Sequence, residues 1–104
     1  MIEETIRSFL AERLDVPVRL SVPAPAPARF VVVEKTGSGC EDGIYSATIA
    51  VQSYGPAATS HDGTLDAAKL LPQLVRCDLY SDYNFPDTTR KRPRYQAVFG
   101  VVHY

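Results

Sequence analysis

The C-terminal segment constrains the fold more than any other part of the chain. Residues 92–104 read RPRYQAVFGVVHY, a basic stretch and a proline followed by apolar, β-prone residues. In a strand, successive side chains point to opposite faces of the sheet. The odd face would carry Tyr95, Ala97, Phe99, Val101 and His103. The even face would carry Gln96, Val98, Gly100, Val102 and Tyr104. We expect a central strand whose odd face, from Tyr95 to Val101, completes the core. The apolar side chains of the even face would then lie outside this core.

Two segments have the apolar spacing of helices. Residues 2–14 carry one stripe that should end by Val16, because Pro17 disfavours helical backbone in its predecessor. That stripe comprises Ile2, Ile6, Phe9, Leu10 and Leu14. A second helix should begin with Asp62 or Thr64 as N-cap. Its apolar stripe would be Leu65, Ala68, Leu71 and Val75. Pro72 lies within it and predicts a kink, or two short helices with Pro72 opening the second.

The remaining segments alternate or are β-branched and indicate strands. We expect a short strand within residues 17–22, then strands at 30–37, 44–54, 79–85 and from 95 onward. The Gly-rich residues 36–43 would form the loop of a hairpin. This order predicts a single α+β domain spanning residues 1–104. Its two layers would be a mixed, mostly antiparallel sheet of about four to five strands and two main helices packed on one face.

The composition excludes several classes of protein. The formal net charge of −1 is unlike that of proteins whose main task is to grip nucleic acid. No run of 18 apolar residues is present, and the charged N-terminus is unlike a signal peptide, so we expect no membrane span. Cys40 and Cys77 are expected to be reduced thiols. With two histidines they lack the spacing of a zinc motif, and we expect no metal or cofactor.

Candidate catalytic residues are few. Ser60, His61 and Asp62 have the residue types of a hydrolase triad, but three consecutive side chains do not line up as nucleophile, base and orienter. A loop-built site around His61, Asp62 and Asp82 is the enzymatic alternative. The loop acids Glu41, Asp42, Asp82 and Asp87 would matter only if they converged in space. We therefore expect no enzymatic activity.

Candidate interaction residues are more numerous. The basic cluster comprises Arg90, Lys91, Arg92 and Arg94, which could contact phosphate or shield the following apolar strand from wrong pairing. Two helices are too few to cover both faces of a sheet, so the surplus apolar surface predicts a partner, most simply another copy. The predicted subunit contacts are Val98, Val102, Tyr104 and Tyr54. The segment PAPAPA at residues 23–28 would serve as a stiff spacer or as a docking strip.

The order of these features resembles that of a known family. The segments FVVVEKTG, VQSYG, LYSDYNF and RYQAVFGVVHY, in this order after an N-terminal helix, are similar to those of the tail terminator, or tail completion, proteins of long-tailed bacteriophages and prophages. The resemblance spans nearly the whole chain. It implies a hexameric ring at the head-proximal end of the tail tube, which stops tube polymerisation and joins tail to head.

The resemblance also implies partners and location. They are a tail tube protein, a head-completion protein and DNA that passes through the lumen without sequence-specific binding. The protein would be assembled in the bacterial cytoplasm and end in the virion tail, with no membrane, small-molecule substrate or cofactor. The basic cluster, residues 90–94, would face the lumen or an acidic neighbouring subunit. The alternative is a small cytoplasmic adaptor that binds a protein through a sheet edge or the Pro-rich strip.

Overall fold

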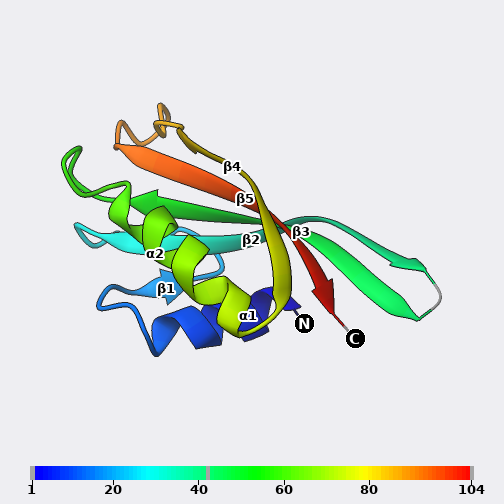
Figure 1. Cartoon of the computed structure of the whole chain (residues 1–104). Coiled ribbons are helices and arrows are strands. Elements are labelled where there is room, and N and C mark those ends of the chain that lie inside the picture. Colours follow the sequence, from blue (N-terminus) through cyan, green and yellow to red (C-terminus); the bar gives the residue numbers. More distant parts are fainter. Residues whose placement is uncertain (1, 42, 104) are drawn as a thin grey trace.

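The computed structural model describes residues 2–41 and 43–103. Its elements are α1 (Ile2–Ala11), β1 (Val18–Arg19), β2 (Phe30–Glu41), β3 (Ile44–Tyr54), α2 (Asp62–Leu70), the 3₁₀ helix η1 (Leu71–Gln73), β4 (Arg76–Asn84) and β5 (Arg94–His103). They form an α+β fold with one five-stranded sheet in the order β1-β2-β3-β5-β4 (Figure 1). β1 is parallel to β2 and the other pairs are antiparallel, which confirms the mixed, mostly antiparallel sheet.

The C-terminal strand is central, as its composition predicts. β5 lies between β3 and β4 and pairs with both along most of its length. Its side chains at Ala97, Phe99 and Val101 are buried in one apolar cluster. The same cluster includes Ile6 and Leu10 of α1, Ala67 of α2, Leu71 of η1 and alternate residues of β2 and β3. The expectation that the odd face of this strand completes the core is confirmed for these three residues, whereas Tyr95 is only partly buried and stacks on His61.

Three of the four residues in the predicted stripe of the second helix pack as expected, because Leu71 is buried and Ala68 and Val75 contact the main cluster. Leu65 is 44% exposed, whereas Gly63, Thr64 and Ala67 are buried. Gly63 lets the first turn of α2 lie close to β3, because a methyl group there would lie within 2.8 Å of the Ser53 Cβ atom. The helix approaches the sheet along this glycine, which a sequence stripe of large apolar residues does not reveal.

The boundaries of the helices also differ in part from the prediction. α2 has His61 as its N-cap, with no side-chain cap bond, so the expected cap at Asp62 or Thr64 is wrong. α2 ends at Leu70, and η1 follows with Pro72 in its first turn, as one of the two alternatives for Pro72 predicts. α1 ends at Ala11, before Val16 as predicted, and irregular turns continue to Leu14, whose N–H donates to the Leu10 carbonyl.

The Gly-rich segment is strand rather than loop. β2 continues to Glu41 and pairs with β3 down to Glu41 and Ile44, so the expected loop at 36–43 is largely wrong while the expected hairpin is correct. We call this hairpin, from Lys35 to Glu41 and from Ile44 to Thr48, the arm. It extends from the body of the molecule to one end (Figure 1). Gly43, with a φ of 78°, occupies the left-handed backbone region that a tight hairpin turn needs.

A second, smaller cluster covers part of the other face of the sheet. Phe30 and Tyr54 stack with their ring centroids 4.4 Å apart, and Val32 and Val22 pack beside them. Since Val31 and Val33 belong to the main core, Phe30 and Val32 point to the opposite side of β2. This small cluster therefore covers one end of the sheet face that was expected to be open to a partner.

Candidate interaction surface

Asp87 organises the loop between β4 and β5. Its backbone N–H and carbonyl pair with those of Arg92, both at 3.0 Å, which closes the turn at 88–91. Its carboxylate is buried, with 4% exposure, and accepts hydrogen bonds from Tyr54 Oη at 3.0 Å and from Arg90 Nη1 at 3.0 Å. The Arg90 backbone N–H adds a third bond at 3.1 Å. The basic loop is therefore built on a buried carboxylate.

These contacts shift two pKa values. Burial raises the pKa of Asp87, but the hydrogen bonds from Arg90 and Tyr54 outweigh that effect and bring the pKa down to about 2. Burial also raises the pKa of Tyr54, with the neighbouring Asp87 acting in the same direction and Arg94 opposing both. Asp87 is thus a carboxylate and Tyr54 a neutral phenol at neutral pH.

Arg92 ties the basic loop to the Pro-rich segment. Its Nη2 donates to the carbonyls of Pro27 and Ala28, at 2.8 and 2.7 Å, and its guanidinium lies 5.1 Å from the centre of the Phe30 ring. The Pro-rich segment is therefore fixed to the body at its C-terminal end, as a spacer would be.

Arg94 holds the start of β5. It donates to the Phe85 carbonyl at 2.7 Å and to Tyr54 Oη at 3.0 Å, and its guanidinium packs over the Phe85 ring. The side chains of Arg90, Arg92 and Arg94 are thus engaged within the chain. Each of the three therefore has a structural role in this loop, and their expected contact with the lumen or with an acidic neighbouring subunit stays a prediction.

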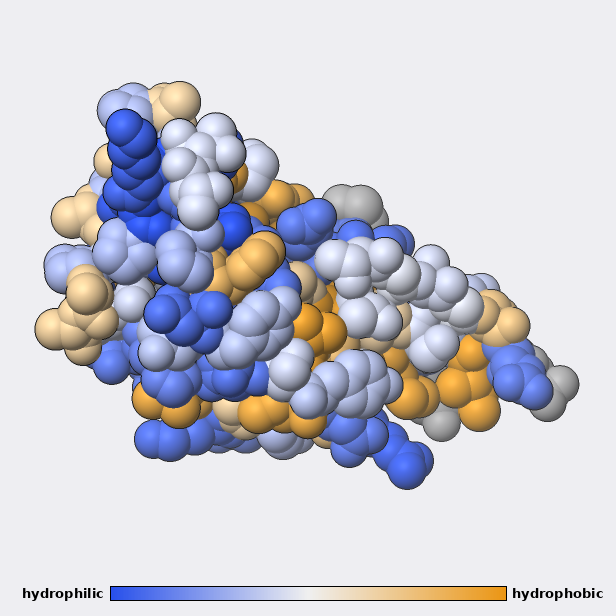
Figure 2. Space-filling model, turned by 90° about the horizontal axis from the view of Figure 1, so that it is seen from above, coloured by the Kyte–Doolittle hydropathy of each residue, from blue (hydrophilic) through white to orange (hydrophobic). Residues whose placement is uncertain are grey.

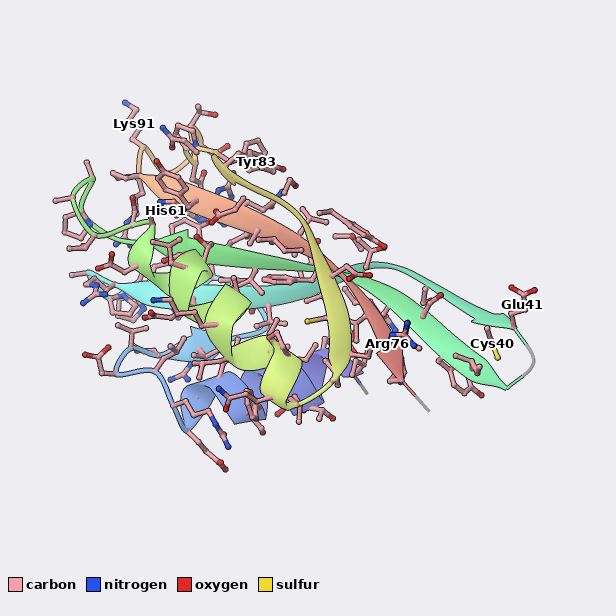
Figure 3. The ribbon with its side chains drawn as sticks, viewed as in Figure 1. Cys40, Glu41, His61, Arg76, Tyr83 and Lys91 are labelled. Atoms are coloured by element: carbon pink, nitrogen blue, oxygen red, sulfur yellow. The ribbon has the colours of Figure 1, made fainter. Side chains whose placement is uncertain are left out.

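Lys91 differs from its three basic neighbours. Its side chain forms no ion pair or hydrogen bond with any residue that the structure describes, and it projects from the loop into solvent (Figure 3). Its φ is 54°, in the left-handed region that costs an L-residue about 1–2 kcal/mol. Lys91 is therefore the member of the predicted cluster whose charge is available to a partner.

A cavity of about 540 Å³ lies beside Lys91. Its apolar lining comes from Ala57, Pro86, Pro93 and Tyr95, and its polar lining from Ser60, Asn84, Asp87, Thr88, Lys91 and Arg92. Both prolines flank the Asp87 turn, so the rigid loop sets the shape of the cavity. The cavity was not predicted from the sequence, because its shape depends on how the loop between β4 and β5 folds and on Ala57 and Ser60 from a distant segment.

Two of the predicted subunit contacts lie on the open part of the sheet. Val102 is 36% exposed and Val98 is partly buried on the same face of β5. Between them the Tyr80 ring packs on Gly100, where a methyl group would collide with the ring. Tyr54 is only 2% exposed and belongs to the second cluster, so its expected role as a subunit contact is wrong. Tyr104 lies outside the described residues.

Exposed large apolar side chains gather in two places. One group follows the edge strand β4 and the residue after it, and comprises Leu79, Tyr80, Tyr83 and Phe85. The other lies on the arm, where Ile44 and Tyr45 are both more than 40% exposed. Figure 2 shows the arm tapering away from the wider body, with apolar side chains along it. Tyr45 lies on the same face of β3 as the buried Ala47 and Ile49, but the arm extends beyond the core.

The structure brings His61 and Asp82 together. His61 Nε2 lies 2.8 Å from Asp82 Oδ2, and the Thr64 hydroxyl donates to Asp82 Oδ1 at 3.0 Å. The His61 ring also stacks on Tyr95 with centroids 4.0 Å apart. Both oxygens of Asp82 thus have a partner, and the contacts link the start of α2 to β4 and β5. The proposed enzymatic site keeps two of its three residues, since no contact joins Asp62 to this pair among the described side chains.

Other kinds of site find little support in the described residues. Within residues 2–41 and 43–103, no three His, Cys, Asp or Glu side chains lie close enough together to hold a metal ion. Cys40 and Cys77 are unpaired thiols, and burial raises the pKa of Cys77. In the same part of the chain, none of the helices has the length and apolar character needed to cross a membrane. Comparison with models of known protein families finds no match to this chain, and comparison with curated protein sequences finds no similar protein.

Proposed function

We infer that this chain is a structural ring subunit of the tail terminator kind. In this proposal six copies close into a ring at the head-proximal end of a phage or prophage tail tube, stop tube polymerisation and join tail to head. The ring is assembled in the bacterial cytoplasm and ends in the virion tail. It catalyses no reaction and holds no cofactor, and its partners are the tube protein, the head-completion protein and the DNA that passes through.

Two different exposed apolar surfaces, the arm and the β4 edge, carry the proposal. The arm bears Ile44 and Tyr45, and the β4 edge bears Leu79, Tyr80 and Tyr83. β4 is the outer strand on one side of the sheet. On the other side, β1 pairs with β2 only at Val31 and Val32, and the rest of β2 has no outer strand partner within residues 2–41 and 43–103. Two unlike surfaces on one subunit favour head-to-tail association, which closes into a ring when the rotation between neighbours permits.

A layered arrangement of the subunit is part of the proposal. Both helices pack on one face of the sheet in two layers and leave the other face to neighbouring subunits. The shared apolar cluster of α1, α2 and the alternate strand residues supports this arrangement. Val98 and Val102 then lie on the face that is open to a neighbour, as the sequence predicts.

The charge distribution suits a ring that DNA passes through. A chain with a formal net charge of −1, whose arginines at 90, 92 and 94 are engaged internally, offers DNA little to hold. Weak attraction is what passage requires, because each neutralised phosphate adds to affinity.

The test uses tail tubes. The gene beside this one should encode a tube protein, and that protein, polymerised in the presence of increasing amounts of the purified chain, should give progressively shorter tubes with a ring at one end. Negative-stain electron microscopy measures both. Unchanged tube lengths with no additional density at tube ends would refute the proposed function.

The free edge of β4 favours a second candidate. Its nine residues have no strand partner on the outer side among the described residues, and an extended peptide could add there as a further strand. In this case the chain is an adaptor and remains a monomer at high concentration. Sedimentation separates the two candidates, because the terminator associates with itself and the adaptor does not.

A further inference from the structure

We propose that the tip of the arm of one subunit seats in the cavity beside Lys91 of the next, with Glu41 paired to Lys91 and Ile44 against the apolar wall. This inference rests on the proposed self-association and names the surfaces that make it. It identifies a second copy of the chain as the occupant of the cavity.

The arm tip has the chemistry that the cavity needs. Glu41 and Ile44 are paired residues at the last described rung of the hairpin, and both are exposed. The hairpin thus presents a carboxylate and a branched apolar side chain within one rung. Both side chains are available to a partner, since Glu41 forms no ion pair with any residue of the described chain and Ile44 is 43% exposed.

The cavity offers the complement of this pair. Lys91 supplies an ammonium without an internal partner, and Pro86, Pro93 and Tyr95 supply a rigid apolar wall. Asp87 also lines the cavity, but its carboxylate is bound by Arg90 and Tyr54 and does not leave a free negative charge to repel Glu41. About 540 Å³ is room enough for several side chains at the end of a hairpin.

The placement of the two sites makes the contact intermolecular. Glu41 lies at the tip of the arm, at one end of the molecule, and Lys91 lies at the other end (Figure 3). The molecule is 43 Å long, so the arm does not reach the cavity of its own subunit. Each subunit therefore gives its arm to one neighbour and receives the arm of another, which is the head-to-tail geometry of a ring.

Complementary charge reversal tests the contact. Glu41→Lys and Lys91→Glu each place like charges at every interface, and each should raise the concentration at half-assembly, measured by sedimentation velocity, by at least about tenfold. An equimolar mixture of the two should restore assembly to within about threefold of the original chain, because rings of even number can alternate the variants. The double variant should assemble alone.

Matched controls change the same charges elsewhere on the surface. Glu12→Lys and Lys69→Glu alter exposed residues outside both sites and should leave half-assembly within about twofold. The thermal transition of every variant should match that of the original chain, which shows that the subunit stays folded.

The outcomes separate the contact from the proposed function. If the original chain forms rings and the two single variants assemble equally well, or if their mixture stays dissociated, the arm does not seat beside Lys91, although the ring stands. If the original chain is a monomer at every accessible concentration, both the contact and the proposed function fall.

Discussion

The Tyr54 hydroxyl donates a hydrogen bond of 3.0 Å to the Asp87 carboxylate, across 33 positions of sequence. The bond joins the end of β3 to the loop that precedes β5. Together with the two bonds from Arg90, it fixes the turn from which Lys91 projects. The basic loop is thus a rigid support for one available cation, which is what a specific contact requires.

Removing the buried charge should destabilise the subunit. Asp87→Asn leaves the Arg90 guanidinium without its carboxylate partner and should lower the free energy of unfolding by about 2–3 kcal/mol, measured by urea denaturation. Tyr54→Phe removes two hydrogen bonds, to Asp87 and from Arg94, and should cost about 1–3 kcal/mol. Asp66→Asn, at an exposed position of α2, is the control and should have little effect. Equal stability of Asp87→Asn and the control would show that this network does not hold the loop.

Acid should weaken the same network in a defined pH window. Because folding lowers the pKa of Asp87 from its usual 3.8 to about 2, its contribution is complete above pH 4 and disappears as the pH falls through 2. The contribution at neutral pH is about 2 kcal/mol. Urea midpoints collected from pH 6 to pH 2 should fall more steeply below pH 4 in the original chain than in Asp87→Asn. Parallel curves would contradict the assignment.

Gly63 should be needed for the approach of α2 to the sheet. A methyl group there would lie 2.8 Å from Ser53 Cβ and 3.0 Å from Val31 Cγ2, in the buried interior. Gly63→Ala should therefore lower the unfolding free energy by about 1–3 kcal/mol, since overpacking displaces the helix. Gly37→Ala, where the nearest atom outside the neighbouring residues is 3.8 Å away, is the matched control. A stabilising effect of Gly63→Ala would mean that α2 lies farther from β3.

Lys91 should show opposite effects on stability and on association. Its left-handed φ favours glycine, so Lys91→Gly should stabilise the isolated subunit by about 1 kcal/mol in urea denaturation. The same change removes the ammonium and should weaken assembly. A variant that is less stable and associates normally would contradict both the backbone assignment and the role of the charge.

The core was predictable where large apolar side chains alternate. Phe99 and Val101 are large and apolar, so the buried face of β5 can be predicted from them directly. Pro72 predicts the end of α2, because proline lacks a backbone N–H and has a fixed φ, and both effects act locally. Of the predicted helix stripe only Leu65 is exposed, since the first turn of α2 buries Gly63, which has no side chain to give an apolar signal in the sequence. The arm was mistaken for a loop because Gly37 and Gly39 are poor strand formers, and pairing with β3 overrides their preference.

The candidate site was less accessible to sequence reasoning. Arg90, Arg92 and Arg94 form a charged run in sequence, but their partners are Asp87, two carbonyls at 27 and 28, and Phe85. Arg92 pairs across more than 60 positions, which leaves no local signal, whereas Arg90 and Arg94 find these partners within the same loop. Tyr54 was assigned to the surface because tyrosines favour interfaces, whereas its hydroxyl is satisfied inside by Asp87 and Arg94.

Self-association into a closed ring is the central claim, and native mass spectrometry combined with negative-stain imaging of the purified chain tests it most directly. The account predicts a particle of six 11.4-kDa subunits that appears as a ring with a central opening. A monomer that persists at high concentration, or an open filament in place of a ring, would contradict it.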